Sequence, residues 1–169
     1  SLDQEDLRRG TVDLQDVLTH ELGHFLGLDH TPLVGAPPVR PTMNPFNSTE
    51  APRIARSLEP DDEAGVSALY PSAGAGANGM ISGSVRHPDD SGAFGVHVVA
   101  YRAGTSEFVV GALSGSAGGR KGQNGDGAYE ISGLPPGEYQ VAIEPLNGAV
   151  TYENFGGIFH APFDTDFSR

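Results

Sequence analysis

Residues 20–30 read HELGHFLGLDH, a stretch that holds three histidines and a glutamate. His20 and His24 are four positions apart, so on a helix both imidazoles project from one face, with Cβ atoms about 5–6 Å apart. That separation suits two corners of a tetrahedral Zn²⁺ site. Gly27 allows the chain to leave the helix through a left-handed conformation and to present His30 as a third ligand. Three protein ligands and a fourth position left for water are typical of a catalytic zinc site.

Glu21 is the acid–base candidate of this stretch. It directly follows the first ligand, so its carboxylate lies close to the metal without needing to bind it. A carboxylate there takes a proton from zinc-bound water and later delivers it to a leaving amine. Two other interpretations stay open. One is solvated surface histidines without metal, and the other is a structural zinc site closed by a fourth ligand, for which Asp29 and His160 are the candidates.

Two helices are predicted in residues 1–71. Asp13 is a favourable N-cap for a helix over 14–26, where apolar residues recur at helical spacing. A second helix carries Pro60 in its first turn, where proline is tolerated, and ends before Pro71. Prolines recur between these two helices, which predicts a long loop over 31–57.

The second half of the chain has a different period. Residues 72–79 are all Ser, Ala, Gly or Asn and are interpreted as a linker. Beyond them apolar residues alternate with polar ones, and turn signals separate the runs. An antiparallel β-sandwich is therefore predicted, and the fold class of the whole chain is α + β. The predicted strands are 80–85, 96–101, 108–110, 129–131 and 139–143.

The histidine pattern, followed by a methionine, resembles the metzincin signature. Met43 in Pro-Thr-Met-Asn-Pro is similar to the methionine turn, the hydrophobic floor beneath the three histidines. Residues 12–19 and 26–30 resemble the matrixin branch, and 58–70 resemble its C-terminal helix. The resemblance implies a zinc-dependent endopeptidase that acts on protein or peptide substrates, with structural calcium as a further possibility by analogy. The residues it implies are catalytic Glu21, the metal ligands His20, His24 and His30, and the supporting residues Gly27, Met43, Asp61 and Asp62.

An aspartate of the pair Asp61–Asp62 ties the C-terminal helix to the methionine turn in that family. For this chain an alternative interpretation stays open, in which the two aspartates only place negative charge at the N-terminus of a helix. Asn44 stands where matrixins often have Tyr, and the spacing from His30 to Met43 is longer than in compact matrixins. Both departures predict an altered substrate pocket.

A matrixin also has an N-terminal sheet whose edge strand binds the substrate, and residues 1–12 are too few to form it. We therefore expect residues 1–71 to be the C-terminal part of a catalytic domain, present as a fragment of low activity. Without that sheet, the apolar face of helix 14–26 is expected to be uncovered.

Residues 80–146 resemble the carboxypeptidase regulatory-like domain, a small transthyretin-like sandwich. The resemblance rests on the turns Gly-Ala-Tyr at 127–129 and Leu-Pro-Pro-Gly-Glu-Tyr at 134–139. It implies an accessory or binding role without chemistry. Residues 124–127 lack the acidic spacing of a calcium loop and are interpreted as a turn. Residues 147–169 are interpreted as the start of a further, truncated segment.

The remaining histidines outside the motif are expected to be surface or satisfied core residues. They are His87, His97 and His160.

The composition excludes several classes of partner. The formal charge is −12, from 10 basic and 22 acidic residues, without a basic cluster, which argues against nucleic acid and anionic membranes. No apolar run approaches the length of a membrane span. The absence of cysteine favours a bacterial exported or a cytosolic protein, and the family resemblance implies a secreted or cell-surface bacterial one. Nothing in the sequence indicates an oligomeric state.

A second function is consistent with the same sequence. In it, the chain is a non-catalytic secreted surface or adhesion protein in which the sandwich binds a partner and the zinc site is vestigial. The presence of all three histidines, Glu21 and Met43 argues against such decay.

Overall fold

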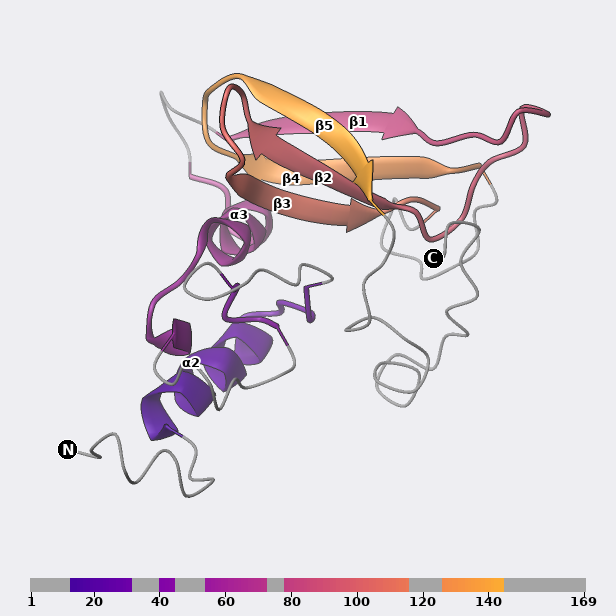
Figure 1. The fold of residues 1–169 in the computed structure, drawn as a ribbon. Coiled ribbons are helices and arrows are strands. Elements are labelled where there is room, and N and C mark those ends of the chain that lie inside the picture. The colour runs from indigo at the N-terminus through magenta and orange to yellow at the C-terminus, as the bar shows by residue number, and fades with distance from the viewer. Residues whose placement is uncertain (1–12, 32–39, 45–53, 73–77, 116–125, 145–169) are drawn as a thin grey trace.

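The computed structural model describes residues 13–31, 40–44, 54–72, 78–115 and 126–144. Among these residues two α-helices precede five antiparallel strands, which confirms the α + β class in its general form. Figure 1 shows helix α3 lying between helix α2 and the strands. The predicted segment 147–169 and most of the loop 31–57 lie outside the described residues, so the predicted domain boundaries stay predictions.

Helix α2 spans Leu14–Phe25, as the sequence predicts to within one residue. Asp13 caps it, because its side-chain oxygen accepts hydrogen bonds from the backbone N–H groups of Gln15 and Asp16 at 3.1 and 3.2 Å. Gly27 follows the C-cap with a φ of 99°, the left-handed conformation that favours glycine. The chain therefore turns sharply at the place where the motif requires a turn.

The apolar side chains of α2 point away from the rest of the described structure. Leu14, Leu18 and Leu22 are more than half exposed, and Phe25 is 85% exposed. The residues that α2 buries are instead Asp16 and Gly23. Within the described part of the chain, this apolar face is thus uncovered.

Helix α3 spans Pro60–Leu69, again as predicted. The Asp62 carboxylate accepts a hydrogen bond from the Glu59 backbone N–H at 3.0 Å, which closes the first turn. A short 3-10 helix, η1, precedes α3 over Ile54–Arg56 and was not predicted, since this stretch was assigned to the loop. Arg56 of η1 forms an ion pair with Asp13, so η1 contacts the start of α2.

The strands form two sheets. β1 (Gly79–Ser84) pairs with β4 (Ala128–Leu134), and β2 lies between β3 and β5 in the second sheet. The bounds of those three strands are His97–Arg102 for β2, Phe108–Leu113 for β3 and Tyr139–Glu144 for β5. All pairs are antiparallel. β3 and β4 each extend past their predicted ends, because pairing with β2 and β1 carries them through Gly111 and Gly133.

Apolar residues from both sheets form a common core. Val98 and Ala100 of β2 and Val109 of β3 meet Ile131 and Leu134 of β4, and all five are nearly inaccessible to solvent. Burying such side chains is the main favourable contribution to folding. Helix α3 packs against β3 and β4, a contact that the sequence analysis did not anticipate.

Candidate metal centre

The three motif histidines converge on one point. His20 and His24 project from α2, and His30 reaches them from the loop after Gly27. The Nε2 atom of His30 lies 3.1 Å from Nε2 of His20 and 3.2 Å from Nε2 of His24. Nitrogen ligands at about 2.0–2.1 Å from a tetrahedral Zn²⁺ ion would be about 3.3 Å apart. The spacing of the three nitrogens therefore fits one shared zinc ion.

Backbone carbonyls fix the orientation of two of the rings. His20 Nδ1 lies 2.7 Å from the Thr42 carbonyl oxygen, and His24 Nδ1 lies 2.9 Å from that of Leu28. A carbonyl only accepts, so each Nδ1 carries the proton and donates it. In the neutral ring, Nε2 is then left with its lone pair, which is the form that binds a metal.

The surroundings of His30 favour the same neutral form. Burial, followed by the neighbouring His24 and His20, lowers the pKa of His30 to about 4. Metal ligands must be deprotonated, so a ring that stays neutral at physiological pH is ready to bind. Glu21 and Asp29 oppose this shift through their charges, which places both carboxylates within electrostatic reach of His30.

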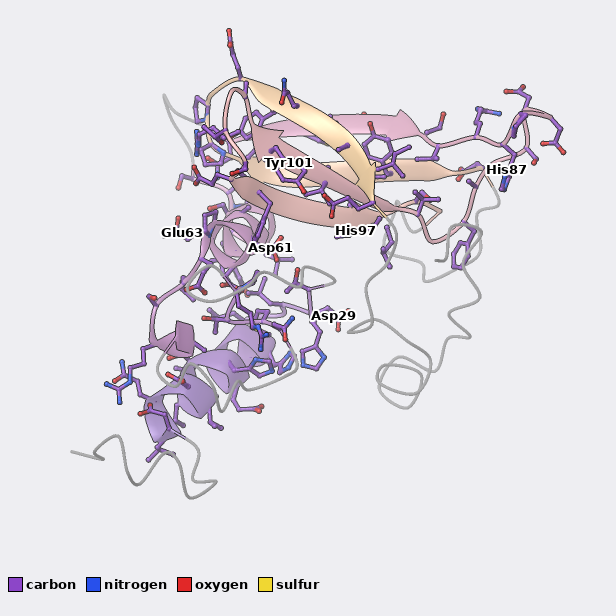
Figure 2. The ribbon with its side chains drawn as sticks, in the orientation of Figure 1. Asp29, Asp61, Glu63, His87, His97 and Tyr101 are labelled. Carbon is purple, nitrogen blue, oxygen red and sulfur yellow. The ribbon has the colours of Figure 1, made fainter. Side chains whose placement is uncertain are left out.

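Glu21 lies on α2 beside His20, and its side chain is exposed to solvent. Asp29, one of the two candidates for a fourth ligand, is also exposed and lies on the side of α2 that faces the sheets (Figure 2). It does not belong to the group of side chains that could hold a metal, which within the described residues consists of the three histidines. His160, the other candidate, lies outside the described residues.

Met43 lies directly against α2 between the two helical histidines. Its side chain is buried, and a Cβ atom added to Gly23 would come within 2.3 Å of the Met43 sulfur. Only glycine at position 23 leaves room for the methionine there. The sequence analysis did not select Gly23; the signal that was available is a glycine in the interior of a helix, between two ligands.

The two aspartates at the start of α3 have different partners. Asp62 is buried and accepts hydrogen bonds from the backbone N–H groups of Thr42 and Met43, both at 2.9 Å. It therefore holds the turn whose Thr42 carbonyl orients His20. Asp61 accepts instead from the Gly111 N–H of β3 at 3.3 Å and from the Thr31 side chain. Burial raises the pKa of Asp61 to about 7.

Glu59 is a further buried carboxyl group that the sequence analysis did not select. It lies 3.0 Å from the Thr42 hydroxyl oxygen, on the other side of the same turn. Burial, and then the hydrogen bond with Asp62, raises the pKa of Glu59 to about 7. Glu59 is the N-cap of α3, and its contact with Thr42 depends on how the preceding loop folds back, which the local sequence does not indicate.

Comparison with known proteins places this centre in context. Residues 3–71 match the family model of the matrixins. The match spans the zinc motif, Met43 and α3, and it supports a zinc-dependent metalloprotease of the matrixin type for this part of the chain, with peptides as substrates. The comparisons with curated proteins and with solved structures gave no match.

The matrixin match ends before the strands begin. The resemblance of residues 80–146 to the carboxypeptidase regulatory-like domain, and with it a sandwich of that type, stays a prediction. Calcium binding has no support in the match. No helix among the described residues is long and apolar enough to cross a membrane.

Proposed function

We propose that the chain carries the catalytic zinc centre of a matrixin-like endopeptidase. The observation that carries this proposal is the convergence of three Nε2 atoms, since that of His30 lies 3.1 Å from that of His20 and 3.2 Å from that of His24. Backbone carbonyls hold the rings of His20 and His24 in the tautomer that binds a metal. His20, His24 and His30 would hold Zn²⁺. The described residues supply three ligands to this group, which leaves a coordination position for water.

Zinc held by these three histidines would polarise the carbonyl of the scissile peptide bond and make the attacking water more acidic. Glu21 is the general base. It receives the proton that the water gives up and passes it to the nitrogen of the departing amine. Its exposure to solvent supports this role, because the carboxylate is accessible to a peptide that binds from outside.

The supporting residues act through the ligands and not on the substrate. Asp62 fixes the backbone of Thr42 and Met43, and Thr42 in turn fixes the His20 ring. Met43 fills the space beside Gly23, and Gly27 provides the turn that brings His30 back to α2. Partners of this kind typically change metal affinity or activity by about 10–100-fold when they are mutated.

Glu21→Gln is the test of the mechanism. It should lower peptide hydrolysis by about 10²–10⁴-fold, the usual contribution of a general acid–base group, and leave one zinc bound per chain. Peptide cleavage and zinc content are measured on the same preparations, for this chain and for a longer chain that includes the upstream gene sequence. Glu63→Gln is the matched control, since Glu63 is an exposed glutamate on α3.

Cleavage by the Glu21→Gln variant at the parent rate would show that Glu21 is not the base. A parent chain that binds zinc and cleaves no peptide in either length would favour the surface or adhesion protein with a vestigial site. A secreted or cell-surface location is a further proposal, which rests on the family resemblance, and fractionation of the source cells tests it.

A further inference from the structure

Helix α3 connects the metal centre to the sheets through two adjacent carboxylates. Asp62 faces the turn at Thr42–Met43, whereas Asp61 faces β3 and the chain just after His30. Figure 2 shows Asp61 beside α3, below the strands. A displacement of α3 relative to the sheets would therefore change the contacts of Asp61 directly.

Helix α3 lies very close to the sheets at one point of contact, Gly133 of β4. A Cβ atom added to Gly133 of β4 would come within 1.9 Å of the Ala64 carbonyl oxygen of α3. Gly133 has a φ of +77°, a conformation that a side chain would also disfavour. The backbones of α3 and β4 thus approach as closely as glycine allows.

Thr31 is the link between Asp61 and the metal ligands. It directly follows His30, its backbone N–H donates to the Met43 carbonyl at 3.1 Å, and its side chain bonds to Asp61. His30 and Thr31 line an open pocket of about 210 Å³ together with Gly111 of β3. The loop that carries the third ligand therefore faces β3 across this pocket, and Asp61 bonds to both sides.

We propose that Asp61 is a positioning residue through which the docking of α3 on β3 and β4 holds Thr31, and with it the third histidine ligand, in place. The inference rests on the proposed function for its link to zinc, but the contact itself exists without metal. In the proposed enzyme the strands thus help to hold the loop that carries the third metal ligand.

Asp61→Ala and Asp61→Asn form the first pair of variants. Alanine removes the acceptor for both Thr31 and Gly111, whereas asparagine keeps one side-chain oxygen that can accept from Gly111 and an amide that can donate to the Thr31 hydroxyl. In the metal-free chain, hydrogen exchange of the Thr31 amide should rise about fivefold in Asp61→Ala, as expected for the loss of one net hydrogen bond, and stay near the parent value in Asp61→Asn. Zinc affinity, measured by competition with a chelator, should fall about tenfold in Asp61→Ala and recover in Asp61→Asn.

Gly133→Ala and Gly104→Ala form the second pair. Both glycines have a positive φ, +77° and +75°, but a Cβ atom on Gly104 would meet no atom within 4 Å. The backbone strain of the two substitutions is therefore matched, and only Gly133→Ala forces α3 away from β4. Gly133→Ala should raise Thr31 exchange and weaken zinc binding as Asp61→Ala does, whereas Gly104→Ala should change neither.

Circular dichroism first shows that each variant is folded. Equal Thr31 exchange and equal zinc affinity in Asp61→Ala and the parent would overturn the role of Asp61. If Gly133→Ala fails to fold, the two Asp61 variants decide alone. A parent chain that takes up no zinc would refute the proposed function, while Thr31 exchange in the metal-free protein would still decide whether Asp61 positions this loop.

Discussion

Gly23 is the residue at which the methionine turn and the zinc helix meet most closely. Its neighbours along the helix include a metal ligand, His24, and the space beside it is filled by the Met43 sulfur. Any shift of Met43 would also move the backbone of the adjacent Thr42, whose carbonyl orients His20. The lack of a side chain at Gly23 thus affects the geometry of both helical ligands, His20 and His24.

We expect Gly23→Ala to destabilise the chain by about 1–3 kcal/mol, the usual cost of overpacking, and to weaken zinc binding. Gly65→Ala is the matched control, because Gly65 is also helical and its added Cβ would meet only the end of the flexible Leu28 side chain. Alanine favours a helix over glycine by about 1 kcal/mol at both positions, so this gain cancels in the comparison. Urea unfolding of both variants is the measurement. Equal stabilities would show that Met43 moves aside without cost.

The residues of the site were predictable from the sequence to different degrees. The three histidines were selected from their spacing alone, because an interval of four on a helix and a glycine after it determine their positions. Gly23 and Glu59 were missed, because what makes them important is the loop that packs against them. For the same reason, the sequence placed Asp61 and Asp62 in one role, whereas the structure separates their partners.

Helix α2 depends on Asp13 in two ways. The carboxylate caps the helix and also pairs with Arg56 of η1. The Arg56 guanidinium holds the pKa of Asp13 below its ordinary value of 3.8. A lowered pKa means that the charged form stabilises the fold above that ordinary value, and that this contribution is lost as the pH falls through the lower, folded-state value.

The cap and the ion pair are separable by mutation. Asp13→Asn keeps a capping oxygen and loses the charge, whereas Asp13→Ala loses both. We expect Asp13→Ala to be less stable than Asp13→Asn by about 1 kcal/mol at pH 7, since asparagine caps helices about as well as aspartate. Thermal or urea unfolding monitored by helix content measures the difference. Identical stabilities of the two variants would mean that the hydrogen bonds to Gln15 and Asp16 contribute nothing.

Both helices and all five strands were predicted because their signals are local. The N-cap at Asp13, Pro60 in a first turn and the alternation of apolar residues each act within a few positions. The helix η1 was not predicted, because its prominent contact is with Asp13, at a distance in the sequence that no local pattern encodes. The lengths of β3 and β4 were underestimated because glycine is a poor strand former, and pairing with a neighbouring strand overrides that preference.

At the scale of the whole molecule, the missing prediction is the packing of α3 on the sheets. A run of small residues before β1 indicates a linker, and nothing in the sequence of α3 marks it as a surface for β4. The decisive feature is Gly133, which lies beyond the end of the predicted strand 129–131 and which the structure places against Ala64. Which strands pair, β1 with β4 and β2 with β3 and β5, was also beyond a single sequence.

The stability of the sheets should decline in mild acid because of His97 at the start of β2. The sequence favoured a surface or satisfied histidine, but this side chain is buried, and its Nε2 has no hydrogen-bond partner among the described residues. Burial lowers the pKa of His97 to about 4, although the charge of Glu144 opposes the shift. Between the ordinary value of 6.5 and about 4, the unfolded chain binds a proton that the folded chain refuses. Stability therefore rises with pH in this window.

His97→Leu removes this titration. We expect the stability of the parent, relative to the variant, to fall by about 3 kcal/mol at most between pH 6.5 and pH 4. Urea unfolding at several pH values gives both curves, and the other titrating groups cancel in their difference. A difference that does not change with pH would show that His97 accepts a proton in the folded state as readily as in the unfolded one.

The contact between Ala64 and Gly133 also sets an order in time. The histidines and α3 leave the ribosome before β4, on which α3 packs and which follows about 70 residues later. At about 5–20 residues per second, synthesis needs about 4–14 s to cover that interval. During this interval, until β4 emerges, the nascent chain therefore holds the three histidines without the contact between α3 and β4.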